Sequence, residues 1–139
     1  MLELIQSQVV TVPVAQNIPF DQIVAKGGCA EYHRVGAPNV RLLKPGRYLV
    51  TFSANIAVPT GETVGEVSLA ITADDGTLAG SVMRATPAAV EQYFNVSTQH
   101  YVDVPQCCGH VCCVDVAVRN NSEIPVLVDN ANIVVVRVC

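Results

Sequence analysis

A two-residue alternation of apolar and polar side chains is the feature that most constrains what this chain can fold into. In the clearest run, apolar side chains share one face and polar side chains share the other: Tyr48, Val50, Phe52, Ala54 and Ile56 against Arg47, Thr51, Ser53 and Asn55. Segments 66–72 and 113–119 repeat the pattern. Successive side chains of a β-strand point to opposite faces, so each run predicts a strand with one face on a core.

Turn-forming residues separate these runs: Pro45-Gly46, Pro59-Thr60-Gly61, Asp74-Asp75-Gly76 and Asn120-Asn121-Ser122. The pair Asp75-Gly76 predicts a tight hairpin between segments 69–73 and 77–83. Strands at intervals of about 8–12 residues are typical of a β-sandwich or barrel. The short stretch Pro87–Gln92 is the only helical candidate. We expect a single all-β domain over residues 1–139, a usual length for one domain.

Two segments near the ends of the chain, Val9–Val14 and Ile133–Val138, are apolar on both faces. A strand of this kind must be covered on both sides. In a sandwich one side meets the core, and we expect a second copy of the chain to cover the other. A loop of the same chain is the alternative. The candidate interface residues are Val10, Val12, Tyr48, Val134, Val136 and Val138.

Composition supports a partly hidden surface and excludes several functions. Half of the residues are hydrophobic and only 14% are charged, which favours burial between subunits. The net charge is −4 and the eight Lys and Arg residues are scattered, which argues against nucleic-acid binding. No apolar run reaches the length of a membrane-spanning helix. The first residues do not form a signal-peptide core, so we expect folding in a cytoplasm.

The order of several segments resembles the complement and tumour necrosis factor-like globular heads. The matching segments are 14–21, which ends in Phe20-Asp21, then 28–32, then 42–54 with Pro45-Gly46-Arg47-Tyr48. The later segments 67–81, 102–118 and 131–135 follow in the same order. The resemblance implies a jelly-roll β-sandwich of about ten antiparallel strands, packed as a homotrimer. It also implies roles in structure and recognition, and it is closest to bacterial and phage members.

The resemblance leads to one preferred function and two alternatives. The sequence shows neither a signal peptide nor a Gly-X-Y stalk, which favours a phage virion protein of the capsid-decoration or head-fibre type over a secreted ligand. The partners would be two further copies and a larger assembly such as a capsid. One alternative is a receptor- or glycan-binding head that uses residues near 31–34 or 87–93. The other is a coat protein of a spore or cell surface. The aromatic candidates for stacking on a sugar are Tyr32, Tyr48, Tyr93, Phe94 and Tyr101.

The densest local cluster is Cys107-Cys108-Gly109-His110-Val111-Cys112-Cys113. Three interpretations remain open. The cysteines are reduced thiols, as is usual in a cytosol; or Cys107 and Cys112 form a cross-strand disulfide; or Cys107, His110 and Cys112 bind zinc. Of the separate cysteines Cys29 and Cys139, the second is a candidate for a bond between subunits.

Nothing in the sequence predicts catalysis. A catalytic cysteine needs a neighbouring base and a third group that orients the base. None of His33, His100 and His110 lies in such a pattern, and no glycine-rich phosphate loop is present. We therefore expect no enzymatic activity and no cofactor.

Overall fold

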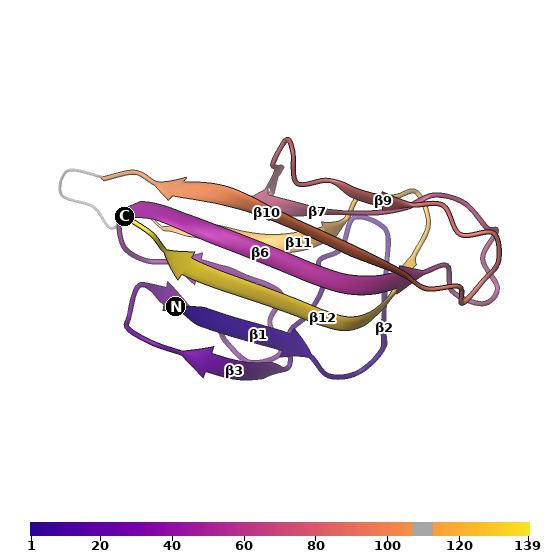
Figure 1. The fold of residues 1–139 in the computed structure, drawn as a ribbon, viewed down its shortest axis with the longest axis horizontal. Helices are drawn as coiled ribbons and strands as arrows, with labels where there is room; N and C mark the ends of the chain where they lie inside the picture. The colour runs from indigo at the N-terminus through magenta and orange to yellow at the C-terminus, as the bar shows by residue number, and fades with distance from the viewer. Residues whose placement is uncertain (107–112) are drawn as a thin grey trace.

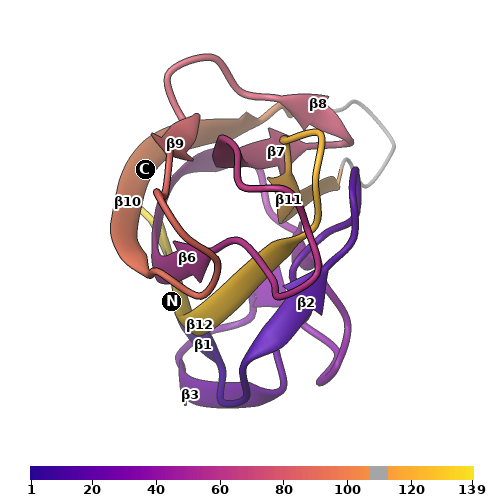
Figure 2. The ribbon, with the colours of Figure 1, turned by 90° about the vertical axis from the view of Figure 1, so that its right-hand side faces the viewer.

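The computed structural model describes residues 1–106 and 113–139, which form twelve β-strands and no helix. The strands build two antiparallel sheets that face each other across an apolar core, as the two views in Figures 1 and 2 show. The sheets are called the front sheet and the back sheet below. Because the described residues contain no helix, they contain no helix that is long and apolar enough to cross a membrane.

The front sheet has the strand order β10-β6-β12-β1-β3, and β2 pairs with the first part of β12. Its longest strands, β6, β10 and β12, lie side by side along the length of the molecule (Figure 1). The bounds are β1 Leu2–Gln6, β2 Val10–Val12, β3 Gln22–Lys26, β6 Gly46–Ala57, β10 Phe94–Val104 and β12 Val126–Arg137.

The back sheet has the strand order β4-β5-β11-β7-β8, and β9 pairs with the first part of β7. Its central strands are β11 and β7. The bounds are β4 Glu31–Tyr32, β5 Val40–Leu42, β7 Val67–Ala73, β8 Gly76–Thr77, β9 Met83–Ala85 and β11 Val114–Asn120.

The core follows the alternation in the sequence. All five apolar side chains predicted to share a face of β6 are buried. Val114, Val116 and Val118 of β11 are buried on the facing sheet, as the alternation of segment 113–119 predicts. Ile18 and Phe20, from the segment between β2 and β3, are also fully buried in the core cluster. The inward faces of both sheets therefore contribute to one continuous core.

The segment Pro45-Gly46-Arg47-Tyr48, which carries much of the family resemblance, has a structural explanation. Gly46 has a φ of 140°, and a Cβ atom there would collide with the backbone oxygen of Cys139. The Tyr48 ring is buried, and its hydroxyl donates a hydrogen bond of 2.7 Å to the carbonyl of Lys44. This turn starts β6 beside the end of β12, with the Arg47 N–H and carbonyl bonded to residues 138 and 139.

The structure corrects two local predictions. The hairpin after β7 is present, but its turn residues are Asp74 and Asp75, with φ values of 48° and 67°, while Gly76 already pairs with Ala73. The helical candidate Pro87–Gln92 is not a helix in the structure. Glu91 has a φ of 56°, which a right-handed helix excludes, and its N–H donates to the carbonyl of Val58 instead.

Candidate assembly face

The outward side of the front sheet, called the assembly face below, is built from alternate residues of β6, β10 and β12. The pairing register places them in cross-strand rows. From one end of the sheet inward, the rows are Tyr101–Leu49–Val136, Gln99–Thr51–Val134 and Ser97–Ser53–Asn132. These side chains point away from the core because their neighbours in each strand, such as Val50 and Val135, point into it. These three rows contain no charged side chain.

The charges at one end of this face neutralise each other. The Arg47 guanidinium donates to both carboxylate oxygens of Asp103, with Nε–Oδ1 at 2.7 Å and Nη2–Oδ2 at 3.0 Å. This hydrogen bonding raises the pKa of Arg47 and lowers the pKa of Asp103. The guanidinium also lies 5.6 Å from the centre of the Tyr101 ring. The pair adds little stability at such exposure, but it leaves no isolated charge for a partner to desolvate.

Other polar groups of the face are also satisfied within the sheet. Asn132 Nδ2 donates to Glu3 Oε2 on β1 at 3.1 Å, and Asn95 Nδ2 donates to Asn55 Oδ1 at 3.0 Å. A surface of valine, leucine, tyrosine and small uncharged polar side chains resembles the fully buried centre of a protein interface. Two carboxylates flank it: Glu3 of β1, opposite Val134, and Asp129 of β12, opposite Asn55, both half-buried. A partner that covers the face must leave these two carboxylates solvated or supply them with a partner.

Two of the predicted interface residues, Val134 and Val136, lie on the assembly face and are half-buried. Val138 lies just beyond the end of β12 and is 45% exposed. Val10 belongs to β2 and packs partly against the core. The structure thus brings Val134 and Val136 together with residues that the prediction did not include: Leu49, Thr51, Gln99 and Tyr101.

The side chains of Val12 and Tyr48 lie elsewhere. Val12 is 2% exposed and Tyr48 is fully buried, both inside the core of their own chain. Tyr48 shares its face with Val50 and Phe52, so the alternation of β6 already assigned it to the core side. The same alternation places Leu49 and Thr51 outward. A side chain this deep in its own core cannot contact a partner, so these two residues are removed from the interface.

The sulfur and imidazole candidates divide between described and undescribed positions. Cys107, His110 and Cys112, with the disulfide and zinc alternatives they carry, lie outside the described residues. Across residues 1–106 and 113–139, no group of three or more His, Cys, Asp or Glu side chains is placed to bind a metal ion. Within the same described residues, Cys29, Cys113 and Cys139 form no disulfide.

The two described histidines are bonded to the backbone. Nδ1 of His33 lies 3.0 Å from the carbonyl oxygen of Asn39, and its Nε2 lies 3.2 Å from that of Phe20. Nδ1 and Nε2 of His100 face the carbonyl oxygens of Tyr101 and Ala79. Their ring nitrogens therefore serve as links between loops and strands of the fold.

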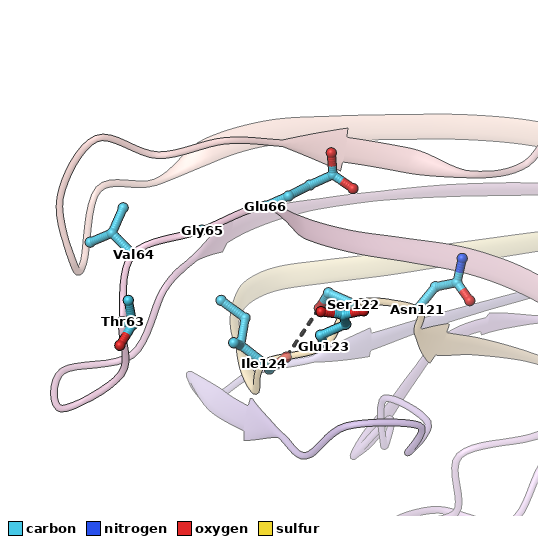
Figure 3. Close-up of a pocket in the computed structure, with 8 residues that line it drawn as sticks. All are labelled: Thr63, Val64, Gly65, Glu66, Asn121, Ser122, Glu123 and Ile124. Atoms are coloured by element: carbon cyan, nitrogen blue, oxygen red, sulfur yellow. Dashed lines mark hydrogen bonds between the residues drawn. The ribbon is translucent and has the colours of Figure 1, made fainter.

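A hollow of about 400 Å³ lies at the end of the sandwich opposite the chain termini, between the β6–β7 loop and the β11–β12 loop (Figures 1 and 3). Its lining residues are Thr63, Val64, Gly65, Glu66, Asn121, Ser122, Glu123 and Ile124. Figure 3 shows the Ser122 hydroxyl bonded to the Ile124 carbonyl, at 3.0 Å. Glu66 forms an ion pair with Arg84 at 3.5 Å. The hydroxyl and one carboxylate are thus already engaged with neighbouring groups.

Several solved structures share this fold at low sequence identity. Murine APRIL at pH 8.5 matches with a TM-score of 0.63 and 12% identity over 99% of this chain and 98% of that chain. The PRD1 vertex protein P5 matches with a TM-score of 0.57 and 16% identity over 99% and 96%. Rabbit GITRL matches with a TM-score of 0.54 and 12% identity over 100% and 95%.

Sequence comparison alone finds no relative: no family model and no curated protein matches the chain. The likeness to the solved structures therefore concerns the fold. The described residues form two antiparallel sheets and no helix. The matches to APRIL and GITRL cover nearly the whole of both chains, so the likeness extends over the complete fold. The fold of the chain is the tumour necrosis factor-like jelly-roll β-sandwich.

Proposed function

We propose that this chain is a non-enzymatic structural protein that assembles as a homotrimer through the assembly face and decorates a virion, as a capsid-decoration or head-fibre protein. The observation that carries the proposal is the pair of adjacent uncharged, partly apolar rows Tyr101–Leu49–Val136 and Gln99–Thr51–Val134 on that face. Among the structures of the same fold, one is a vertex protein, P5 of PRD1, which supports a place on a capsid.

A second copy of the chain is the partner that best fits the assembly face. Val136 and Val134 on β12 are half-buried and lie beside Leu49 and Thr51, so these two rows are uncharged and partly apolar. At the edge of the face, Arg47 and Asp103 of the same subunit form an ion pair and neutralise each other. In a ring of three subunits this face of one copy contacts a different surface of its neighbour, and a trimer is the ring expected for this fold.

The mass of the purified chain in solution tests the assembly. Sedimentation equilibrium at micromolar concentration is expected to give three times the chain mass of 14.8 kDa. Val136→Arg places a charge in the most apolar row of the face, Tyr101–Leu49–Val136, where it would be desolvated without a partner, and is expected to yield monomers. Val35→Arg makes the same change at an exposed loop position of the back sheet and is expected to remain trimeric. A wild-type monomer, or a trimeric Val136→Arg variant, contradicts the proposed interface.

Mass spectrometry of purified virions from the source of the sequence tests the second half of the proposal. The chain is expected among the structural proteins of the particle, in a copy number divisible by three. Detection in purified spores or cell envelopes, with none in virions, would replace the virion proposal by the surface-coat alternative while leaving the trimer intact.

A further inference from the structure

We infer that a basic hollow on the outer side of the back sheet binds a sugar that carries a carboxylate. The hollow measures about 290 Å³ and is lined by Tyr32, Arg34, Ala37, Asn39 and Arg41. It is called the basic hollow below. It lies on the sheet opposite the assembly face and does not depend on the proposed trimer.

The register of two short strands brings the lining residues together. Tyr32 of β4 lies directly opposite Arg41 of β5. Both point outward, because their neighbours Glu31 and Leu42 are buried. The alternation continues past the end of β4: His33 is buried and Arg34 is exposed. Arg34 and Asn39 therefore lie on the same side as Tyr32 and Arg41, at the two ends of the connecting loop.

One of the two guanidinium groups is held in place, and its remaining donors stay free. Arg41 donates through Nε to Asp115 Oδ1 at 3.0 Å and through Nη2 to Asp115 Oδ2 at 3.2 Å. The Asn39 side chain also helps to lower the pKa of Asp115, after the larger effect of Arg41. Within residues 1–106 and 113–139, Nη1 of Arg41 has no hydrogen-bond partner. A side chain oriented in this way loses little conformational entropy when it binds a ligand.

The other guanidinium supplies the charge that attracts an anion. Arg34 forms no ion pair with any residue that the structure describes, whereas Arg41, Arg47, Arg84 and Arg119 are each paired with a carboxylate. In a chain of net charge −4, this leaves an uncompensated positive charge at a concave site. Guanidinium groups bind carboxylates through paired, charge-assisted hydrogen bonds, which predicts a carboxylate as the anionic group.

The Tyr32 ring adds an apolar wall. It is 52% exposed and stands opposite Arg41 across the β4–β5 pair. An aromatic ring with a polar hydroxyl suits a ligand that has both an apolar face and hydroxyl groups, as a pyranose ring does. The size of the hollow is at the lower end of ligand sites and fits one such ring. A uronate- or sialate-type sugar combines the ring with the carboxylate.

A titration followed by amide chemical shifts tests this inference on the full chain. Sodium glucuronate and sodium N-acetylneuraminate are the probes, with glucose and sodium phosphate as controls. We expect at least one probe to shift the amides of residues 32–34 and 39–41 saturably, with a dissociation constant on the order of 1 mM for such a small and shallow site. Glucose should not shift them at the same concentration, and raising the salt to about 0.5 M should weaken binding.

Substitutions separate the proposed site from a non-specific effect of charge. Arg34→Gln and Tyr32→Ala change exposed side chains and are each expected to raise the dissociation constant about tenfold or more, from loss of a charge-assisted pair or of the ring contact. Arg84→Gln removes the same charge at another exposed position of the back sheet and should leave binding unchanged.

Three results overturn the inference. The first is the absence of a shift at about 50 mM of either acidic sugar, far above the dissociation constant expected for a small ligand. The second is phosphate binding as tightly as both sugars, which reduces the hollow to a simple anion site. The third is unchanged binding by Arg34→Gln. None of these results affects the mass measured for the trimer, so the two proposals fail separately.

Discussion

At the scale of single residues, a few positions allow almost no substitution, and Gly46 is the clearest. Its φ of 140° and the nearby backbone oxygen of Cys139 together exclude a Cβ atom. The neighbouring Tyr48 hydroxyl and the bonds of Arg47 to residues 138 and 139 hold the same turn from the other side. The turn thus ties the start of β6 to the end of β12, the two central strands of the front sheet.

Gly46→Ala is expected to lower the free energy of unfolding by about 2–4 kcal/mol, because it adds backbone strain and forces residues 45–46 away from the C-terminal segment. Gly65→Ala is the control. Gly65 has an ordinary φ, and its nearest neighbours would be 4.0 Å from a new Cβ, so the change should be within about 0.5 kcal/mol. Urea unfolding measures both. A Gly46→Ala variant as stable as the wild type would show that the turn adapts freely.

The ion pair between Arg41 and Asp115 predicts a pH dependence of stability. Hydrogen bonds from Arg41 lower the pKa of Asp115 below its usual value. A carboxyl group whose pKa is lower in the folded than in the unfolded chain stabilises the fold above the unfolded value, about 3.9, and loses this contribution as the pH falls through the folded value. Because the side chain is partly exposed, solvent screening keeps the effect below about 1 kcal/mol.

Urea unfolding at a series of pH values measures this contribution. Asp115→Asn should therefore be less stable than the wild type near neutral pH, and the difference should shrink as the pH is lowered from about 4 to 2. Asp129→Asn, at a carboxylate without an ion pair in residues 1–106 and 113–139, is the control. A difference for Asp115→Asn that is constant over this range would mean that the pair does not titrate with folding.

At the scale of elements, the β7–β8 hairpin shows strain at an unusual turn. Asp74 and Asp75 both have positive φ values, the geometry that two-residue hairpin turns need and that glycine or asparagine adopts most easily. Side chains compensate in part. Asp74 Oδ1 accepts a hydrogen bond from the Asp115 N–H at 2.9 Å, and Asp75 pairs with Arg119 at 3.1 Å. The Asp75 pair is exposed, so it repays little of the cost.

Asp75→Gly is expected to raise the free energy of unfolding by about 0.5–1 kcal/mol, because glycine adopts the left-handed conformation without the penalty of a side chain. Asp75→Ala is the matched control. It keeps the penalty and loses the contact with Arg119, so it should be less stable than the wild type. If the two variants were equally stable, the contact with Arg119 would account for the effect of Asp75, and relief of backbone strain would contribute nothing.

At the scale of the whole molecule, the sequence predicts what depends on local alternation and misses what depends on register. The inward face of β6 and the valines of β11 follow from the alternation alone. Strand β7 is different: Ser68 and Thr72, on its outward side, are also buried. Arg119 lies opposite Ala70 on this outward face and reaches to Asp75. The residues of segment 67–73 alone do not reveal that Arg119 of β11 lies beside this outward face.

Strand register also limits how much of the assembly face and of the basic hollow the sequence can predict. Val134 and Val136 were identified because β12 is apolar on both faces, but Leu49 and Tyr101 join them only through the pairing of β6 with β12 and β10. In the basic hollow, the sequence predicts only segment 31–34 as a candidate ligand contact. Asn39 and Arg41 reach it through the β4–β5 register, which a single sequence does not reveal.

The two chain termini lie toward the same end of the sandwich (Figure 1). Met1 bonds to Gly27 and Glu31 there, and Cys139 bonds to Arg47 at the start of β6. A polypeptide fused after Cys139 would therefore leave the molecule at that end, without disturbing Glu31, the buried carboxylate that pairs with the Met1 ammonium group. Peptides inserted in the loop between β6 and β7 would emerge from the opposite pole. The fold can thus serve as a two-sided display scaffold, with cargo anchored at one pole and epitopes presented at the other.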